Sequence, residues 1–240
     1  MTILSIVLGS LSVILRVFDT SGNQSHRVAS LWSRLICQWN GIRVKITGTE
    51  NILTNQPQIF IANHQGYYDI FALAGYLNVQ LRWVSKAILF RIPFMGWAMS
   101  ASRYISVERN DRKQSYQAFL KTLEAINMGS SIVVFPEGTR SEDGSIGDFK
   151  KGSQLLAQRA AIPMVPITII GTRSIIRKGS MIIHPGPIQI IISPHVTLDT
   201  KNAKKGDKIL QVIRNTICEN FKDSLKTNLT NKKRDSSEPL

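Results

Sequence analysis

Two short runs of the 240-residue chain combine side chains that could do chemistry. The first, residues 63–69 (Asn-His-Gln-Gly-Tyr-Tyr-Asp), places His64 five residues before Asp69. A histidine exchanges protons near neutral pH, and a carboxylate that accepts a hydrogen bond from one ring nitrogen fixes its tautomer. The second, residues 135–141 (Phe-Pro-Glu-Gly-Thr-Arg-Ser), places an arginine after a glycine turn, which suits an anionic group. Together they predict an enzyme that activates a hydroxyl group on a phosphate-bearing substrate.

The spacing of the first run does not by itself bring its two side chains together. On one continuous helix, five residues rotate by about 140°, so His64 and Asp69 would point apart. They meet only if the chain bends between them, which Gly66 makes easy. The alternative is that Asp69 caps a helix while His64 faces solvent. The other histidines show no companion ligands, so the sequence predicts no metal site.

In the second run, Pro136 ends an apolar stretch, and Gly138 lets backbone amides approach a ligand. Arg140 can bind a phosphate through two parallel hydrogen bonds. Glu137 would repel a phosphate, so we expect it to pair with an arginine or to accept hydrogen bonds from substrate hydroxyls or from the loop. Two further cations, Lys86 and Arg109, close strand-like segments and could add to this site, although each could equally be a solvated surface charge.

These runs must be positioned by a scaffold, and the rest of the chain indicates its type. Short β-branched runs alternate with helical patterns after residue 40, which predicts an α/β domain with a mostly parallel central sheet flanked by helices. The expected strands are residues 58–62, 81–85, 104–108, 131–135, 164–170, 180–184 and 187–193. The expected helices lie near residues 69–78, 95–101, 111–127, 152–161 and 205–224. The turn sequence His-Pro-Gly-Pro at residues 184–187 predicts a hairpin between the last two strands.

The N-terminal segment is apolar and differs from the rest of the chain. Residues 3–18 contain a single charge, and a helix of this length would reach roughly 22–24 Å, short of the ~30 Å hydrocarbon core of a bilayer. Residues 28–39 follow with an amphipathic pattern that includes Trp32 and Trp39, typical of an interfacial helix. We expect residues 1–40 to form a helical hairpin in one membrane leaflet. A soluble helix pair packed on the core and a cleaved signal peptide are the alternatives.

Composition limits the partners and the architecture. The net charge of +14 favours anionic partners, whether nucleic acid, an acidic membrane surface or an acidic carrier protein. Only two cysteines occur, so a disulfide framework is not expected. The expected organisation is a membrane-associated hairpin at residues 1–40, one catalytic domain at residues 41–224 and a disordered basic tail at residues 225–240.

The order of these runs resembles the glycerolipid acyltransferases, specifically the 1-acyl-glycerol-3-phosphate acyltransferases. The resemblance rests on His64 and Asp69 in the first run and on Phe-Pro-Glu-Gly-Thr-Arg in the second. Three further blocks extend it over roughly residues 40–195: residues 88–96, 105–109 and 165–167. One departure is visible, because many family members carry a serine where this chain has Gly66.

The resemblance implies roles for particular residues. It makes His64 and Asp69 the catalytic pair and Pro166 a residue linked to the acyl donor. It assigns binding of the phosphate-bearing substrate to Lys86, Arg109, Glu137, Gly138, Thr139 and Arg140. It implies no cofactor or metal, with acyl-CoA or acyl-carrier protein as co-substrate.

The expected function is transfer of an acyl group from the thioester to the sn-2 hydroxyl of lysophosphatidic acid, which gives phosphatidic acid. We expect the protein to lie on the cytoplasmic face of the cell membrane, in contact with membrane lipids. Its N-terminal segment would anchor it in one leaflet. Two alternatives are the same chemistry on glycerol-3-phosphate, a lysophospholipid or a lyso-aminolipid, and a noncatalytic protein that binds anionic lipid. Nucleic acid is not an expected partner, because no recognition motif accompanies the charge and the apolar N-terminus would have no purpose.

Overall fold

The computed structural model describes residues 2–108, 110–177, 179–180, 182–197 and 206–235, with side chains described up to residue 226. These residues form one seven-stranded sheet of order β1-β7-β6-β2-β5-β3-β4. The strands are β1 (Arg43–Thr47), β2 (Ile59–Ala62), β3 (Leu81–Lys86), β4 (Ile105–Val107), β5 (Ser131–Val134), β6 (Met164–Ile170) and β7 (Pro187–Ile192). Neighbouring strands are parallel except for the antiparallel pair β6 and β7. The predicted α/β class with a mostly parallel sheet is therefore confirmed.

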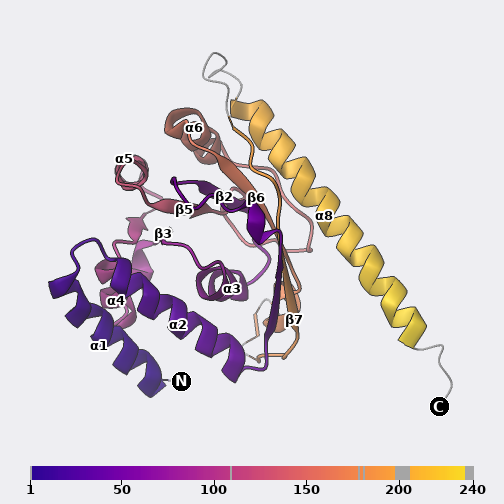
Figure 1. Cartoon of the computed structure of the whole chain (residues 1–240), viewed down its shortest axis with the longest axis horizontal. Coiled ribbons are helices and arrows are strands. Elements are labelled where there is room, and N and C mark those ends of the chain that lie inside the picture. Colours follow the sequence, from indigo (N-terminus) through magenta and orange to yellow (C-terminus); the bar gives the residue numbers. More distant parts are fainter. Residues whose placement is uncertain (1, 109, 178, 181, 198–205, 236–240) are drawn as a thin grey trace.

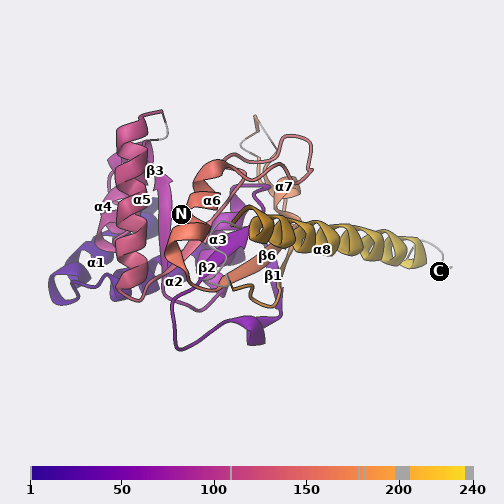
Figure 2. The ribbon, with the colours of Figure 1, turned by 90° about the horizontal axis from the view of Figure 1, so that it is seen from above.

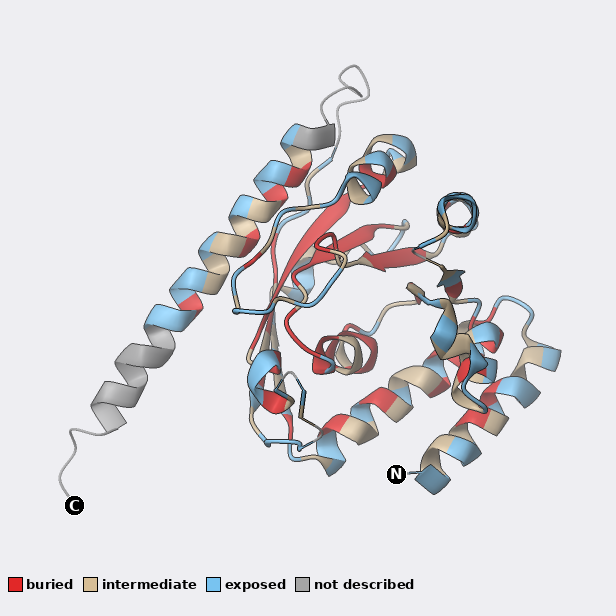
Figure 3. Ribbon diagram, turned by 180° about the vertical axis from the view of Figure 1, so that it is seen from behind, coloured by how far each residue is buried: buried red, intermediate tan, exposed pale blue. Residues whose placement is uncertain are grey.

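Helices cover both faces of the sheet (Figure 1). They are α1 (Thr2–Phe18), α2 (Asn23–Trp39), α3 (Tyr68–Tyr76), α4 (Met95–Ala101), α5 (Arg112–Asn127), α6 (Lys151–Ala160), α7 (Thr172–Ile175) and α8 (Gly206–Asp235), with short 3-10 helices η1 (Thr49–Asn51) and η2 (Ala87–Arg91). Figure 3 shows the buried residues gathered on the central strands and on the inward sides of these helices.

The central strand β2 is covered by helices on both faces of the sheet, and all of its residues are apolar. Phe60 and Ala62 pack in the core beneath α2 and α3, whereas Ile59 and Ile61 pack in the core beneath α5, α6 and α8. All four side chains are buried. A parallel strand buried on both faces has no position for a polar residue. The first polar residues therefore come where the strand ends, at the carboxyl edge of the sheet.

The predicted N-terminal helical hairpin is present as α1 and α2. Gly22 joins the two helices with a left-handed φ of 78°, and a Cβ there would lie 2.9 Å from the carbonyl oxygen of Ala101. α2 packs on α3, and α1 packs on α2 and α4. The outward side of α1 leaves large apolar side chains exposed, among them Val7, Val17 and Phe18. Within the described residues, no helix combines the length and the apolar character that crossing a bilayer requires.

Three expectations about elements are wrong. β1 was not expected, and it pairs in parallel with β7, which lies about 140 residues later. Residues 180 and 182–184 form no strand, so the expected hairpin is absent and β7 pairs with β6 instead. The backbone N–H of His184 donates to the carbonyl of Ile175, and two prolines nearby lack the N–H that a strand ladder needs.

The third correction concerns the C-terminal tail. α8 continues to Asp235, so residues 225–235 are helical rather than disordered. Residues 225–235 contain neither proline nor glycine, the residues that interrupt helices most strongly, and residues 236–240 of the expected tail lie outside the described residues. Figure 2 shows that α8 runs past the sheet towards the C-terminus.

Candidate active site

The loop between β2 and α3 brings His64 and Asp69 into contact. The Nδ1 atom of His64 lies 2.7 Å from Oδ2 of Asp69. The same carboxylate oxygen accepts the backbone N–H groups of Gln65 at 2.7 Å and Gly66 at 2.9 Å. Asp69 is fully buried, so these hydrogen bonds are shielded from water. One carboxylate oxygen therefore holds both the imidazole and the bend in the chain.

Gly66 is at a position where the loop touches a neighbouring segment. A Cβ atom there would lie 2.6 Å from the carbonyl oxygen of Thr172, at the start of α7. That distance is well inside van der Waals contact, and the obstacle is backbone. A serine at this position would meet the same obstacle, which accounts for glycine where the resembled family often has serine.

The imidazole of His64 is fixed on a second side by an aromatic ring. It stacks on Phe135 with 4.1 Å between the ring centroids and 17° between the planes. The side chain keeps 16% of its surface exposed. Because Asp69 engages Nδ1, the opposite nitrogen, Nε2, is the one that can accept a proton from a substrate.

Glu137 connects the two sequence runs. Its Oε1 accepts the backbone N–H of His64 at 2.8 Å, and its Oε2 accepts the backbone N–H of Gly147 at 2.9 Å. Burial raises the pKa of this carboxyl, while the two amide hydrogen bonds oppose that shift. In the reverse direction, the N–H of Ser141 donates to the carbonyl of His64 at 2.8 Å. Glu137 therefore accepts hydrogen bonds from the loops, which is one of the roles expected for it.

The predicted anion-binding residues occupy the neighbouring surface. Gly138 adopts a left-handed φ of 72°, which produces the expected turn. Thr139 and Arg140 follow it and are exposed. The guanidinium carbon of Arg140 lies 3.7 Å from the centre of the Tyr67 ring, a cation–π contact that orients it without using its hydrogen-bond donors. Arg109 lies outside the described residues.

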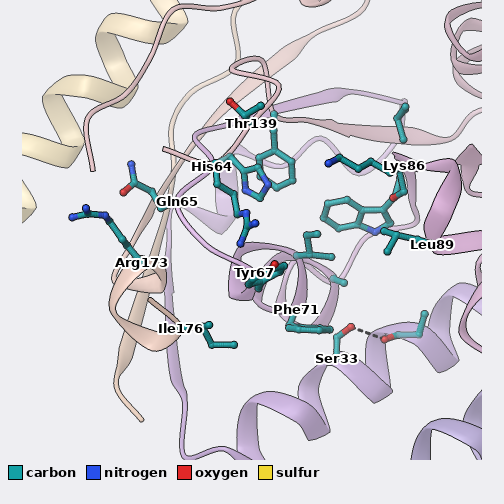
Figure 4. A pocket seen from close by; sticks show the side chains of 18 of the residues that line it. Ser33, His64, Gln65, Tyr67, Phe71, Lys86, Leu89, Thr139, Arg173 and Ile176 are labelled. Carbon is teal, nitrogen blue, oxygen red and sulfur yellow. Dashed lines mark hydrogen bonds between the residues drawn. The ribbon is translucent and has the colours of Figure 1, made fainter. Parts of the chain in front are cut away.

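A cavity of about 1480 Å³ joins these groups. Its polar wall includes His64, Lys86, Thr139, Arg140, Arg173 and Arg177. Its apolar wall comes from the N-terminal hairpin, α3, η2 and α4 and includes Leu8, Trp32, Phe71, Leu89 and Met99. Figure 4 shows His64 between these two kinds of lining. The cavity can thus hold a molecule with an anionic end and a long apolar end, and place its hydroxyl group near an imidazole base.

Metal chemistry has no evident ligands in the described part of the chain, where no three histidine, cysteine or acidic side chains gather.

A comparison with known proteins places this site in a family. The acyltransferase family model matches residues 43–170, more than half of the chain, and this range contains the His64–Asp69 pair and the Glu137 loop. The chain belongs to the acyltransferase family.

Several relatives of this acyltransferase have curated names. It is 34% identical over 198 residues to the chloroplastic 1-acyl-sn-glycerol-3-phosphate acyltransferase BAT2 of Brassica napus, which covers 82% of this chain and 56% of the relative. It is 33% identical over 155 residues to the 1-acyl-sn-glycerol-3-phosphate acyltransferase of Pseudomonas aeruginosa, covering 64% of this chain and 59% of the relative. The chain spans about half the length of the curated relatives it matches.

A solved structure shares the fold of this acyltransferase. The 1-acyl-sn-glycerophosphate acyltransferase PlsC from Thermotoga maritima superposes with a TM-score of 0.75 at 24% identity, and the match covers 91% of this chain and 90% of that one. The family model does not reach the N-terminal hairpin. The structural match covers nearly the whole chain.

Two features of the acyltransferase site differ from the sequence expectation or were missed by it. Pro166 lies inside β6 opposite Ile61 and does not line the cavity around His64. Arg173 and Arg177 line the cavity but were not expected there. The sequence signal for Arg173 is similar to that for Lys86: a cation at or within a few residues of the carboxyl end of a strand in a mostly parallel sheet.

Proposed function

We propose that this acyltransferase moves an acyl group from an acyl thioester to the sn-2 hydroxyl of 1-acyl-glycerol-3-phosphate and so makes phosphatidic acid. The observation that carries the proposal is the His64–Asp69 pair, joined at 2.7 Å, on the wall of the cavity that also contains Arg140. A base, a cation and an apolar chamber are the three elements that acylation of a lysolipid phosphate requires. The names of the curated relatives agree with this acceptor.

The reaction begins with proton transfer to His64. Nε2 takes the proton of the sn-2 hydroxyl while the hydroxyl oxygen forms a bond to the thioester carbonyl carbon. The tetrahedral intermediate collapses, the C–S bond breaks, and the imidazolium returns the proton to the departing thiolate. Asp69 holds the ring in the tautomer that leaves Nε2 unprotonated and stabilises the imidazolium. General-base assistance of this kind contributes about 10²–10⁴-fold to the rate.

The cations near His64 hold the acceptor in place. Arg140 offers a planar fork of N–H donors that matches a phosphate, and its contact with Tyr67 fixes its direction. Lys86, at the carboxyl end of β3, adds a positive charge on the same cavity. Fixing the phosphate aims the neighbouring hydroxyl at Nε2, and such positioning can contribute on the order of 7–11 kcal/mol, more than the proton transfer itself.

The substrates and product are lipids, so we infer that the site works at the membrane surface. The exposed apolar side of α1 would enter one leaflet, and the net charge of +14 would favour anionic lipid. The cavity reaches the inner side of this hairpin at Leu8 and Trp32, so a lysolipid could enter it from the leaflet. The donor is acyl-CoA or acyl-carrier protein, and the enzyme would lie on the cytoplasmic face, where these thioesters are made.

Thiol release tests the proposed reaction. The purified chain is mixed with palmitoyl-CoA, with and without lysophosphatidic acid, and free thiol and phosphatidic acid are measured together. We expect both products in equal amounts and only when the acceptor is present, and we expect neither from His64→Ala. Full activity in His64→Ala would reject the base assignment. Release of thiol with another acceptor but not with lysophosphatidic acid would reject the proposed substrate.

Vesicle sedimentation tests the anchor. The double variant Val17→Lys and Phe18→Lys places two charges on the exposed end of α1, where the two side chains are 76% and 83% exposed. We expect it to lose binding to phosphatidylglycerol vesicles, despite its added positive charge, because burying the apolar side chains contributes more than surface attraction. Met128→Lys, an exposed site after α5, is the matched control. Unchanged binding of the double variant would place the membrane contact elsewhere.

A further inference from the structure

The segment after β6 contributes a second cationic wall to the cavity. Gly171 turns the chain with a left-handed φ of 97° where β6 ends, and α7 follows. Arg173 lies in α7 and Arg177 two residues beyond it, and both are exposed and line the cavity that contains His64. These residues lie beyond the range that the family model matches. Their place in the cavity wall therefore comes from the structure rather than from the family match.

Arg173 is fixed relative to His64. Its Nη2 donates to the carbonyl of Glu142 at 2.8 Å, and a Cβ at Gly144 would lie 3.1 Å from its Nη1. The carbonyl of Gly144 in turn accepts the side-chain amide of Gln65 at 3.2 Å. Gln65 directly follows His64, so a short chain of contacts links the guanidinium to the catalytic loop. A guanidinium has five N–H donors, and the contact with Glu142 uses one of them.

The cations lie on two sides of the imidazole. Figure 4 shows Arg173 and Gln65 on one side of His64 and Lys86 on the other. The cavity lining also includes two acidic residues, Glu142 and Asp143. The carboxylate of Asp143 is engaged within its own loop, where the Ser145 hydroxyl and backbone hold its pKa down at about 2. Four cationic side chains against two acidic ones leave the lining positively charged.

Cations on opposite sides of a base serve two anionic groups better than one. The proposed reaction, on which this inference rests, brings together a phosphate-bearing acceptor and a donor that carries phosphates when it is a coenzyme A thioester. We propose that Arg173 and Arg177 form a second phosphate-binding wall, across His64 from Lys86, that binds a phosphoryl group of one of these two substrates. Arg173 supplies the fixed guanidinium and Arg177 adds charge at the same wall.

Substrates with and without phosphate test this wall and identify its ligand. The variants are Arg173→Gln and the double variant with Arg177→Gln. The donors are palmitoyl-CoA and the phosphate-free palmitoyl-N-acetylcysteamine thioester, and the acceptors are lysophosphatidic acid and the phosphate-free monoacylglycerol. We expect the KM of one phosphate-bearing substrate to rise about tenfold or more, the size of a lost charge-assisted hydrogen bond. Arg159→Gln, which removes an exposed arginine outside the cavity, is the matched control.

The pattern of losses distinguishes the two sources of phosphate. A raised KM for lysophosphatidic acid with both donors assigns the wall to the acceptor. A raised KM for palmitoyl-CoA that disappears with the N-acetylcysteamine thioester assigns it to the donor. An equal fall in kcat for every substrate pair, including the phosphate-free pair, would mean that Arg173 only clamps the loop at Glu142 and would overturn the proposal. A KM within twofold of wild type for all substrates would overturn it as well.

Direct binding keeps this inference separate from the proposed reaction. Trp32 and Trp83 line the cavity, so tryptophan fluorescence can report titrations with coenzyme A and with lysophosphatidic acid. We expect the arginine variants to weaken one of these two Kd values about tenfold, and Arg173→Lys, which keeps the charge, to weaken it less. If the wild-type chain binds both molecules but releases no thiol, the proposed reaction is rejected. The Kd values of the variants would still test the phosphate-binding wall. Unchanged Kd values for both molecules would overturn the inference alone.

Discussion

Two histidines of this acyltransferase are held by hydrogen bonds to their ring nitrogens, and their partners differ. His26, in α2, is buried, with Nδ1 2.8 Å from the hydroxyl of Tyr104 and Nε2 3.1 Å from the carbonyl of Val79. The backbone N–H of Leu81 also approaches Nε2, at 3.3 Å, so both ring nitrogens of His26 have partners. His64 has a carboxylate partner, Asp69, and keeps part of its ring exposed.

The difference shows how surroundings decide what a histidine does. Burial, helped by the nearby Arg82 and opposed by the hydrogen bond to Val79, lowers the pKa of His26 to about 4. This ring stays neutral and joins the N-terminal hairpin to the sheet. His64 has a neighbour that stabilises its charged form and a nitrogen that faces the cavity, which is what a base requires. Changing Asp69, the partner of His64, should therefore lower the rate, whereas changing Tyr104, the partner of His26, should lower the stability.

The largest expected effect is that of Asp69→Asn. An amide can donate to Nδ1 and so place the ring proton on Nε2, the wrong nitrogen for a base. We expect kcat to fall about 10²–10⁴-fold while the KM values for both substrates change little. Initial rates of thiol release measure this effect. A denaturant titration is the control, because Asp69 also accepts the N–H groups of Gln65 and Gly66. Activity within tenfold of wild type in a folded variant would contradict the assigned role.

The contact between His64 and Asp69 could be anticipated because the two residues are close in the chain, although their spacing alone did not decide it. His64, Asp69 and Gly66 belong to one loop, and a bend at the glycine was the only requirement for contact. The turn at Gly138 was predictable for the same reason, since glycine is the residue that adopts its left-handed φ most easily. β2 was predictable from its unbroken apolar run.

The remaining features depend on partners that are distant in the chain. His26 finds Tyr104 78 residues later, and nothing in its local sequence indicates that contact. β1 is a short strand whose only sequence signal is the alternation of Val44 and Ile46 with polar residues, and its partner β7 lies about 140 residues away. Glu137 could have paired with an arginine, and only the fold placed two backbone N–H groups against it instead.

The role of the buried His26 can be tested through the dependence of stability on pH. His26 has a folded-state pKa of about 4 against 6.5 for an ordinary histidine, so the unfolded chain binds more protons between these values. The contribution of this residue is complete above pH 6.5 and is lost as the pH falls towards 4, by about 3 kcal/mol. We expect the free energy of unfolding in urea to fall over this range more steeply for wild type than for His26→Gln. Parallel pH profiles would show that His26 does not titrate on unfolding.

A smaller effect on the catalytic side is expected from Gly66→Ala. The added Cβ would lie 2.6 Å from the carbonyl oxygen of Thr172, so the loop or α7 must move. A displacement of about 1 Å of a catalytic group can cost on the order of 10²-fold in rate, and we expect kcat to fall by about that amount. Gly152→Ala is the matched control, because neither glycine has a left-handed φ and no atom lies within 4 Å of the Cβ added at Gly152. Equal kcat values for both variants would show that the contact with Thr172 is not needed.

The smallest expected effect returns to the buried side of the comparison, with Tyr104→Phe. Removing the hydroxyl leaves Nδ1 of the buried His26 without its hydrogen-bond partner, which typically costs about 1–2 kcal/mol of stability. We expect thiol release to stay within about twofold of wild type, because this hydroxyl contacts His26 rather than His64. A double-mutant cycle with His26→Gln measures the coupling of the pair in urea. A large loss of kcat without a loss of stability would mean that the His26–Tyr104 pair takes part in the reaction. The contrast with the His64–Asp69 pair would then be wrong.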